Sequence, residues 1–183
     1  MAVPATVRAG AVVCHPHPQY GGDRFDNVVA ALYGSWPALG IATLRFDFRP
    51  EFSDGIGERL DASAALDELE GRVGKVPVVM AGYSFGAWVA AGLTDDRITA
   101  IVLVAPPLAV MPPVPGPSVP TLVLTPEHDQ FSPPAGSAPI IAEWNAQSTT
   151  PIDHQVVSMA DHFLVGHTAA IATRTTTWLA DHL

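Results

Sequence analysis

One stretch of this chain links an apolar run, Val76-Pro77-Val78-Val79-Met80-Ala81, to the pentapeptide Gly82-Tyr83-Ser84-Phe85-Gly86. A helical pattern follows over residues 87–93, so the pentapeptide lies between an expected buried strand and an expected helix. A strand that turns directly into a helix brings two backbones into close approach, which glycine tolerates better than any other residue. The spacing therefore predicts a tight, strained strand-to-helix turn with Ser84 at its apex.

A Gly-x-Ser-x-Gly sequence in this context is typical of the nucleophile elbow of serine hydrolases. The turn exposes the serine hydroxyl, and it directs the backbone N–H of the next residue, at a helix N-terminus, toward a developing oxyanion. We therefore predict Ser84 as a nucleophile and the Phe85 N–H as one oxyanion donor. The alternative is an ordinary serine in a glycine-bounded structural turn.

The composition predicts one compact domain over residues 1–183. Hydrophobic residues make up 48% of the chain and charged residues 15%, which is typical of a globular protein and not of a disordered one. The net charge is −9, with nine Lys and Arg and no basic cluster, so we expect neither nucleic acid nor an anionic membrane surface as a partner. The sequence shows no signal-peptide pattern and no apolar run of transmembrane length, and we expect a cytoplasmic protein.

Short apolar runs alternate with helical patterns along the chain. Strands are expected at residues 11–14, 41–46, 76–81, 98–104, 121–124 and 154–157, and helices at 27–39, 57–73, 84–93, 139–145 and 164–183. This alternation indicates an α/β fold with about six mostly parallel strands and helices on both faces of the sheet. The Pro-rich segment 106–120 is too short for a helical lid, so we expect no lid domain.

Functional residues of such a sheet lie in the loops beyond the carboxyl ends of its strands. Three of these loops contain Ser84, Asp129 and His162, in that order along the chain. Ser…Asp…His is the order found in α/β-hydrolases. The sequence therefore predicts a catalytic triad at this edge of the sheet.

Four segments together resemble a known family. They are His15-Pro16-His17-Pro18-Gln19-Tyr20-Gly21-Gly22, the elbow at 82–87, the segment 121–129 that ends in Asp129, and Ala160-Asp161-His162-Phe163. The chain is similar in these segments to small bacterial α/β-hydrolases, a group of predicted carboxylesterases and dienelactone-hydrolase-like proteins with an HPHPxYGG motif. The resemblance implies a minimal α/β-hydrolase fold and carboxylesterase-type chemistry. Two departures from the family pattern are a short N-terminal region and a shortened segment at 50–55.

His162 is the expected general base, because it alone among the candidate histidines lies between the last strand and the last helix. His154 is expected to open a strand, His167 to lie inside the last helix, and His182 to end the chain.

Asp129 is the expected acid that orients the imidazole. Glu127, two residues earlier in the same expected loop, is an open alternative, and Asp153 is a further rival. Asp161 is adjacent to His162 in the chain, which makes a straight bond to its ring awkward.

The second oxyanion donor is expected in the loop after the first core strand. Pro16 and Pro18 have no N–H, so Gln19 is the first candidate and Tyr20 the second. We expect His17 and Tyr20 to contact substrate, and Leu108 and Met111 to form a shallow apolar wall.

The pair His15 and His17 suggests a metal only weakly, because Gln19 and Tyr20 stand where further ligands would be needed. We expect no metal and no cofactor.

These residues favour a serine hydrolase that cleaves a small uncharged ester through a Ser84 acyl-enzyme. Thioester hydrolysis and acyl transfer would use the same triad, and a non-catalytic binding protein on the same fold is the alternative from another class. The sequence leaves the oligomeric state open.

Overall fold

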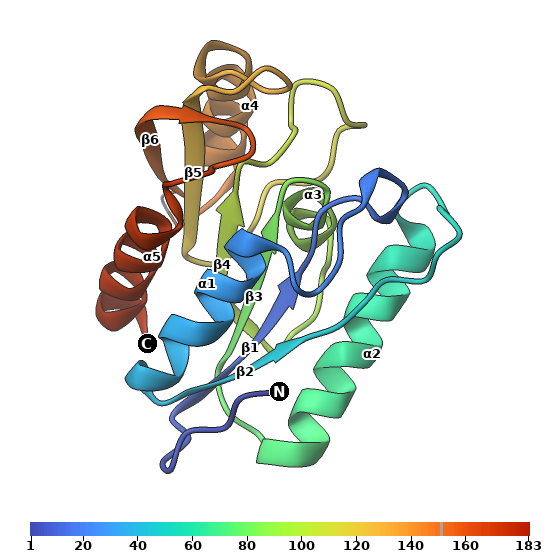
Figure 1. Cartoon of the computed structure of the whole chain (residues 1–183), viewed down its shortest axis with the longest axis vertical. Helices are drawn as coiled ribbons and strands as arrows, with labels where there is room; N and C mark the ends of the chain where they lie inside the picture. Colours follow the sequence, from blue (N-terminus) through green and yellow to red (C-terminus); the bar gives the residue numbers. More distant parts are fainter. Residues whose placement is uncertain (151) are drawn as a thin grey trace.

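The computed structural model describes residues 1–150 and 152–183. Its centre is a six-stranded sheet with the strand order β2-β1-β3-β4-β5-β6 (Figure 1). Each neighbouring pair in the sheet is parallel. The strands are β1 Ala9–Cys14, β2 Ile41–Arg45, β3 Val78–Tyr83, β4 Ile98–Val104, β5 Thr121–His128 and β6 Ile152–Asp161.

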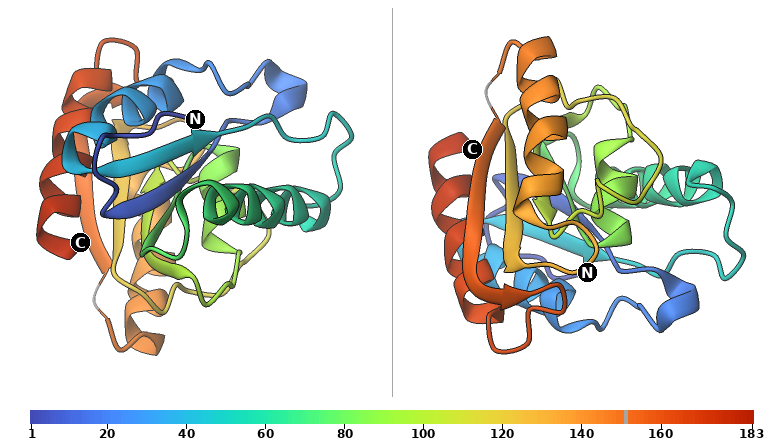
Figure 2. Two further views of the ribbon diagram at one scale, coloured as in Figure 1. Left: turned by 90° about the horizontal axis from the view of Figure 1, so that it is seen from below. Right: turned by 90° about the horizontal axis from the view of Figure 1, so that it is seen from above.

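Helices cover both faces of this sheet (Figure 2). They are α1 Asn27–Ser35, α2 Ile56–Val73, α3 Phe85–Ala91, α4 Pro134–Gln147 and α5 Thr168–His182, with short 3₁₀ turns η1 Pro18–Tyr20 and η2 Trp36–Leu39. Side chains of α1 and α5 pack in the core on one face, and those of α2, α3 and α4 pack in the core on the other. The expected α/β fold is confirmed.

The strands β1, β3 and β4 are buried on both faces, which is why their sequences read as continuous apolar runs. Alternate residues of one strand enter different cores: Val12 joins the core beneath α2 and α3, whereas Val13 joins the core beneath α1 and α5. Both cores hold the central strands rigidly, so the loops at their carboxyl ends start from fixed points.

Several element ends differ from the sequence-based expectation. The expected helix 27–39 divides into α1 and η2, with Pro37 in the first turn of η2. Helix α5 begins at Thr168 and not at 164, because Leu164 and Gly166 have φ angles of 54° and 81°, which do not occur inside a right-handed helix. His167 therefore precedes α5 instead of lying within it.

The connection between β4 and β5 carries no lid. In the described structure, residues 105–120 form turns and extended chain without a helix. The loops that follow β3 and β5 are therefore not covered by an inserted domain. Among the described helices, none is both long and apolar enough to cross a membrane.

The two glycines of the pentapeptide are required by close backbone contacts. A Cβ atom on Gly82 would lie 2.2 Å from the carbonyl group of Gly86, and a Cβ atom on Gly86 would lie 2.4 Å from the carbonyl oxygen of Cys14. These neighbours are backbone atoms that cannot move aside independently. The elbow, α3 and β1 are thus packed at the minimum distance that two backbones allow.

We expect Gly86→Ala to destabilise the protein by about 3 kcal/mol or more, because overpacking against rigid backbone is costly. Gly71→Ala is the matched control: Gly71 lies in α2 and a Cβ there meets no atom within 4 Å. That change should raise stability by about 0.5–1 kcal/mol. Urea unfolding followed by circular dichroism measures both. Equal effects of the two substitutions would contradict the packing argument.

Candidate active site

Ser84 lies at the turn between β3 and α3 with φ 53° and ψ −122°. This left-handed conformation is strained for a residue that has a side chain. Hydrogen bonds hold it in place: the Ser84 N–H donates to the Val104 carbonyl at 2.9 Å, and the Ser84 carbonyl accepts from Ala87 and Trp88. The strained turn predicted from the pentapeptide is therefore present.

The structure brings Ser84, His162 and Asp129 into one hydrogen-bonded chain. Ser84 Oγ lies 2.8 Å from His162 Nε2, and His162 Nδ1 lies 2.8 Å from Asp129 Oδ2. The side chains of His162 and Asp129 are buried, with exposed fractions of 6% and 0%. The three residues come from the carboxyl ends of β3, β6 and β5.

The electrostatics of Asp129 favour its ionised form. Burial alone would raise the pKa of this carboxyl group, but hydrogen bonds from His162 and from the backbone of Ser132 and Phe131 outweigh burial and hold the pKa below its usual value. A carboxylate opposite Nδ1 keeps the proton on that nitrogen. Nε2 is then free to accept the hydroxyl proton of Ser84.

The position of the Asp129 carboxylate is set by its own loop. Oδ1 accepts hydrogen bonds from the backbone N–H groups of Phe131 at 2.8 Å and Ser132 at 2.9 Å. These two bonds leave Oδ2 directed at the imidazole. The loop thereby fixes the carboxylate before any substrate is present.

Glu127 has a different partner and is not at the imidazole. Strand β5 extends to His128, so Glu127 is a strand residue and not the loop residue that the sequence suggested. Its Oε2 accepts from the backbone N–H of Met159 at 2.8 Å. Met159 has a φ of 59°, so Glu127 secures a strained residue three positions before His162.

The backbone of His162 is held on both sides. Its N–H donates to the side-chain oxygen of Gln130 at 3.3 Å, and its carbonyl accepts from the Tyr83 hydroxyl at 2.8 Å. Sequence reasoning missed both residues. Tyr83 stands inside the pentapeptide, but nothing in the sequence pairs its hydroxyl with a loop some eighty positions later.

His15 is buried in the loop after β1, and both of its ring nitrogens have backbone partners. Its Nε2 accepts from the Phe48 N–H at 2.9 Å, which leaves the proton on Nδ1, and Nδ1 donates to the Pro16 carbonyl at 2.6 Å. Burial lowers the pKa of His15 and favours this neutral form. Because the Pro16 carbonyl and the His17 N–H belong to one peptide unit, His15 fixes the orientation of both.

Both expected second oxyanion donors are engaged elsewhere. The Gln19 N–H donates to His17 Nδ1 at 3.2 Å, and the Tyr20 N–H donates to the His17 carbonyl at 3.0 Å. The cause is the turn η1, for which His17 acts as the N-cap residue. Within the described residues, the N–H groups of His17 and Phe85 have no acceptor.

The expected substrate-contacting residues divide into two groups. The His17 ring contacts Phe85 and Tyr20 with centroid distances of 4.5 and 5.0 Å, and Tyr20 is 88% exposed. Leu108, by contrast, is buried in the core, and Met111 packs against that core. The Pro-rich segment folds the apolar side chain of Leu108 inward, so Leu108 exposes little surface for the expected apolar wall.

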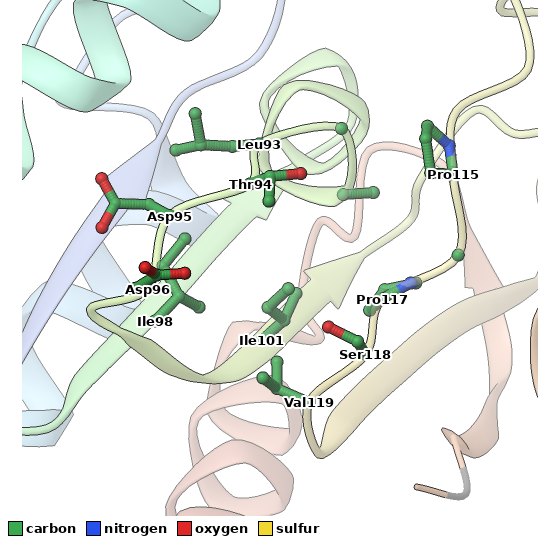
Figure 3. Close-up of a pocket in the computed structure, with 13 residues that line it drawn as sticks. Leu93, Thr94, Asp95, Asp96, Ile98, Ile101, Pro115, Pro117, Ser118 and Val119 are labelled. Carbon is green, nitrogen blue, oxygen red and sulfur yellow. The ribbon is translucent and has the colours of Figure 1, made fainter. Parts of the chain in front are cut away.

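A cavity of about 270 Å³ lies near the amino-terminal ends of β4 and β5 (Figure 3). Its lining includes Leu93, Asp96, Ile101, Pro117 and Val119, from the segments that precede and begin β4 and β5. Ser84 and His162 follow the opposite, carboxyl ends of the strands. In the described residues, no group of three or more His, Cys, Asp and Glu side chains could hold a metal ion.

This protein belongs to the alpha/beta hydrolase family, whose members match residues 11–182 of the chain. It is 31% identical over 171 residues to the uncharacterized protein RP471 of Rickettsia prowazekii, with 84% of this chain and 71% of that protein covered.

Two solved structures show the same fold. An alpha-beta serine hydrolase homologue from Coxiella burnetii has a TM-score of 0.79 and 27% identity, over 94% of this chain and 86% of that one. The protein of unknown function ATU1826 from Agrobacterium tumefaciens has a TM-score of 0.84 and 28% identity, over 98% of this chain and 88% of that one.

Proposed function

We propose that this protein is a serine hydrolase of carboxylesterase type that cleaves small uncharged esters through an acyl-enzyme on Ser84. The observation that carries the proposal is the chain Ser84–His162–Asp129, with both hydrogen bonds at 2.8 Å. Family membership and the likeness to a serine hydrolase homologue support it. The complete hydrogen-bonded chain favours catalysis over the non-catalytic binding role.

The reaction follows from the positions of the protons. His162 Nε2 accepts the hydroxyl proton as Ser84 Oγ forms a bond to the ester carbonyl carbon, and Asp129 stabilises the resulting imidazolium. The tetrahedral intermediate then collapses, the bond to the leaving oxygen breaks, and the imidazolium protonates that oxygen. Water, deprotonated by the same nitrogen, releases the acid and restores the Ser84 hydroxyl.

We assign the oxyanion donors to the backbone N–H groups of Phe85 and His17, in place of the expected pair Phe85 and Gln19. Both groups are without an acceptor in the described structure, and the two residues contact each other through their rings. The hydrogen bond from His15 to the Pro16 carbonyl fixes the peptide unit that contains the His17 N–H. A donor held rigidly before reaction needs no reorganisation when charge develops on the substrate.

The surroundings of Ser84 favour small substrates. No helical lid follows β4 in the described residues, so no inserted helix covers a long acyl chain. A net charge of −9 disfavours polyanionic substrates. Thioester hydrolysis and acyl transfer to another alcohol remain activities that this site would support by the same steps.

The wild-type protein should react with a fluorophosphonate probe, and Ser84→Ala should not, because the probe requires an activated serine. Ser84→Ala and His162→Ala should each reduce kcat for p-nitrophenyl acetate by about 10⁴-fold or more, and the double variant should be little worse than either. Absence of labelling in the wild type would favour the binding protein instead.

Asp129→Asn should lower kcat by up to about 10⁴-fold, because the neutral amide favours the wrong imidazole tautomer. Glu127→Gln is the matched control, since Glu127 bonds to Met159 and not to the imidazole. It should retain most of its kcat. A mild effect of Asp129→Asn together with a severe effect of Glu127→Gln would move the acid to Glu127.

Among p-nitrophenyl esters of increasing acyl length, kcat/KM should be highest from acetyl to butyryl. Each methylene group adds about 0.8 kcal/mol only when it is fully buried, and the open site buries few of them. The same assay with emulsified triglyceride should show no increase in rate at the lipid interface. A preference for long-chain triglycerides would contradict the open site.

A further inference from the structure

We propose that Phe131 and Phe163 form a subsite for an aromatic leaving group beside His162, so that esters of aromatic alcohols are preferred substrates. The proposal rests on the proposed function and specifies the substrate of the same site. It concerns the alcohol side of the ester, which neither the family nor the hydrogen-bonded chain defines.

Phe131 and Phe163 are the aromatic neighbours of His162 that lie partly in solvent. Their exposed fractions are 45% and 53%, which is high for phenylalanine in a protein whose other large apolar residues are mostly buried. The Phe131 ring lies 4.7 Å from the imidazole centroid at an angle of 71°, and the Phe163 ring lies 5.9 Å from it at 87°. Both rings therefore lie directly beside His162, the proposed general base.

The chemistry assigns this side of the site to the leaving group. Nε2 of His162 must deliver a proton to the leaving oxygen, so that oxygen lies within hydrogen-bond distance of the imidazole when the bond breaks. The oxyanion, in contrast, lies toward the N–H groups of Phe85 and His17. The remainder of the alcohol therefore extends past the residues that surround the imidazole, which are Phe131 and Phe163.

The arrangement of the two rings favours an aromatic group over a saturated one. Their centroids are 6.4 Å apart and their planes meet at 82°, so the two partly exposed rings are arranged edge to face. Aromatic rings prefer such edge-to-face or offset contacts, which contribute beyond the area they bury. A purely aliphatic alcohol would gain binding free energy only from the burial of its apolar surface.

Hydrogen bonds hold the backbones of both phenylalanines. The Phe131 N–H donates to Asp129 Oδ1 at 2.8 Å, and the Phe163 N–H donates to Asp161 Oδ1 at 3.0 Å. The backbone of each residue is thus fixed next to a member of the Ser84–His162–Asp129 chain. The loops that carry the two rings therefore need little backbone rearrangement when a ligand binds.

The test compares benzyl acetate with cyclohexylmethyl acetate, which have the same acyl group and a six-membered ring at the same position. The ratio of their kcat/KM values is divided by the ratio of their rates of hydroxide-catalysed hydrolysis, which removes the intrinsic difference between the alcohols. In the wild type we expect the corrected ratio to favour the benzyl ester about two- to tenfold. Phe131→Leu and Phe163→Leu should each lower it toward one.

Phe25→Leu is the matched control. Phe25 is 61% exposed, but its ring packs against the guanidinium groups of Arg24 and Arg45. This variant should keep the wild-type ratio. Fluorophosphonate labelling of Ser84 in every variant shows that each protein is folded and that its nucleophile reacts.

A second pair of esters distinguishes the two sides of the site. Methyl phenylacetate and methyl cyclohexylacetate carry the ring on the acyl group, and the ratio of their rates should not change in Phe131→Leu or Phe163→Leu. A corrected benzyl preference near one in the wild type would overturn the proposal. So would a preference that both leucine variants retain, or a change confined to the acyl pair. The proposal is also overturned if the wild-type protein reacts with the fluorophosphonate but hydrolyses neither pair of esters. If the wild-type protein does not react with the fluorophosphonate, the proposed function itself is rejected.

Discussion

The contact between the start of α3 and the end of β1 is the constraint on which the rest of the site depends. Gly86 lies so close to the Cys14 carbonyl that no side chain fits between them, and Gly82 lies equally close to Gly86. This contact forces the chain through a turn in which Ser84 adopts a φ of 53°. It also brings the free N–H of Phe85 next to the loop that carries His17. The positions of the Ser84 hydroxyl and of the proposed oxyanion donors therefore arise from one packing contact.

The strain in this fold is concentrated where the chemistry is proposed. The non-glycine residues with positive φ in the described structure are Asp54, Ser84, Ala105, Met159 and Leu164. Four of them directly follow a strand or lie near its carboxyl end, and Asp54 lies in the loop between β2 and α2. Each such residue costs on the order of 1–3 kcal/mol and persists only when its surroundings determine its conformation. The two buried cores supply that rigidity, and bonds such as Glu127 to Met159 supply it locally.

The sequence predicts most of this architecture because strand burial and glycine spacing are local signals. The apolar runs predict the six strands, and chain order with loop position selects Ser84, Asp129 and His162, which the structure brings together. Gln19 failed as a donor because the direction of an N–H depends on a turn, η1, that proline content alone does not define. The burial of Leu108 was not predictable, because hydrophobicity does not say whether a loop residue faces inward. The roles of Tyr83 and Gln130 depend on pairing across the fold, which no local pattern contains.

The aromatic residues around Ser84 divide into two groups with different physical roles. Near His17, the rings of Phe48 and Phe85 are buried and contact His15 or His17, so they support the loop that carries the proposed donor, whereas Tyr20 and Phe52 contact the same His17 ring and are exposed. Beside His162, Phe131 and Phe163 leave about half of their surface exposed to water. Keeping two apolar rings exposed has a free-energy cost that the fold could avoid with polar residues. A ligand ring that covers Phe131 and Phe163 removes that cost each time it binds, and their exposure directly beside His162 is the physical basis for assigning them to substrate.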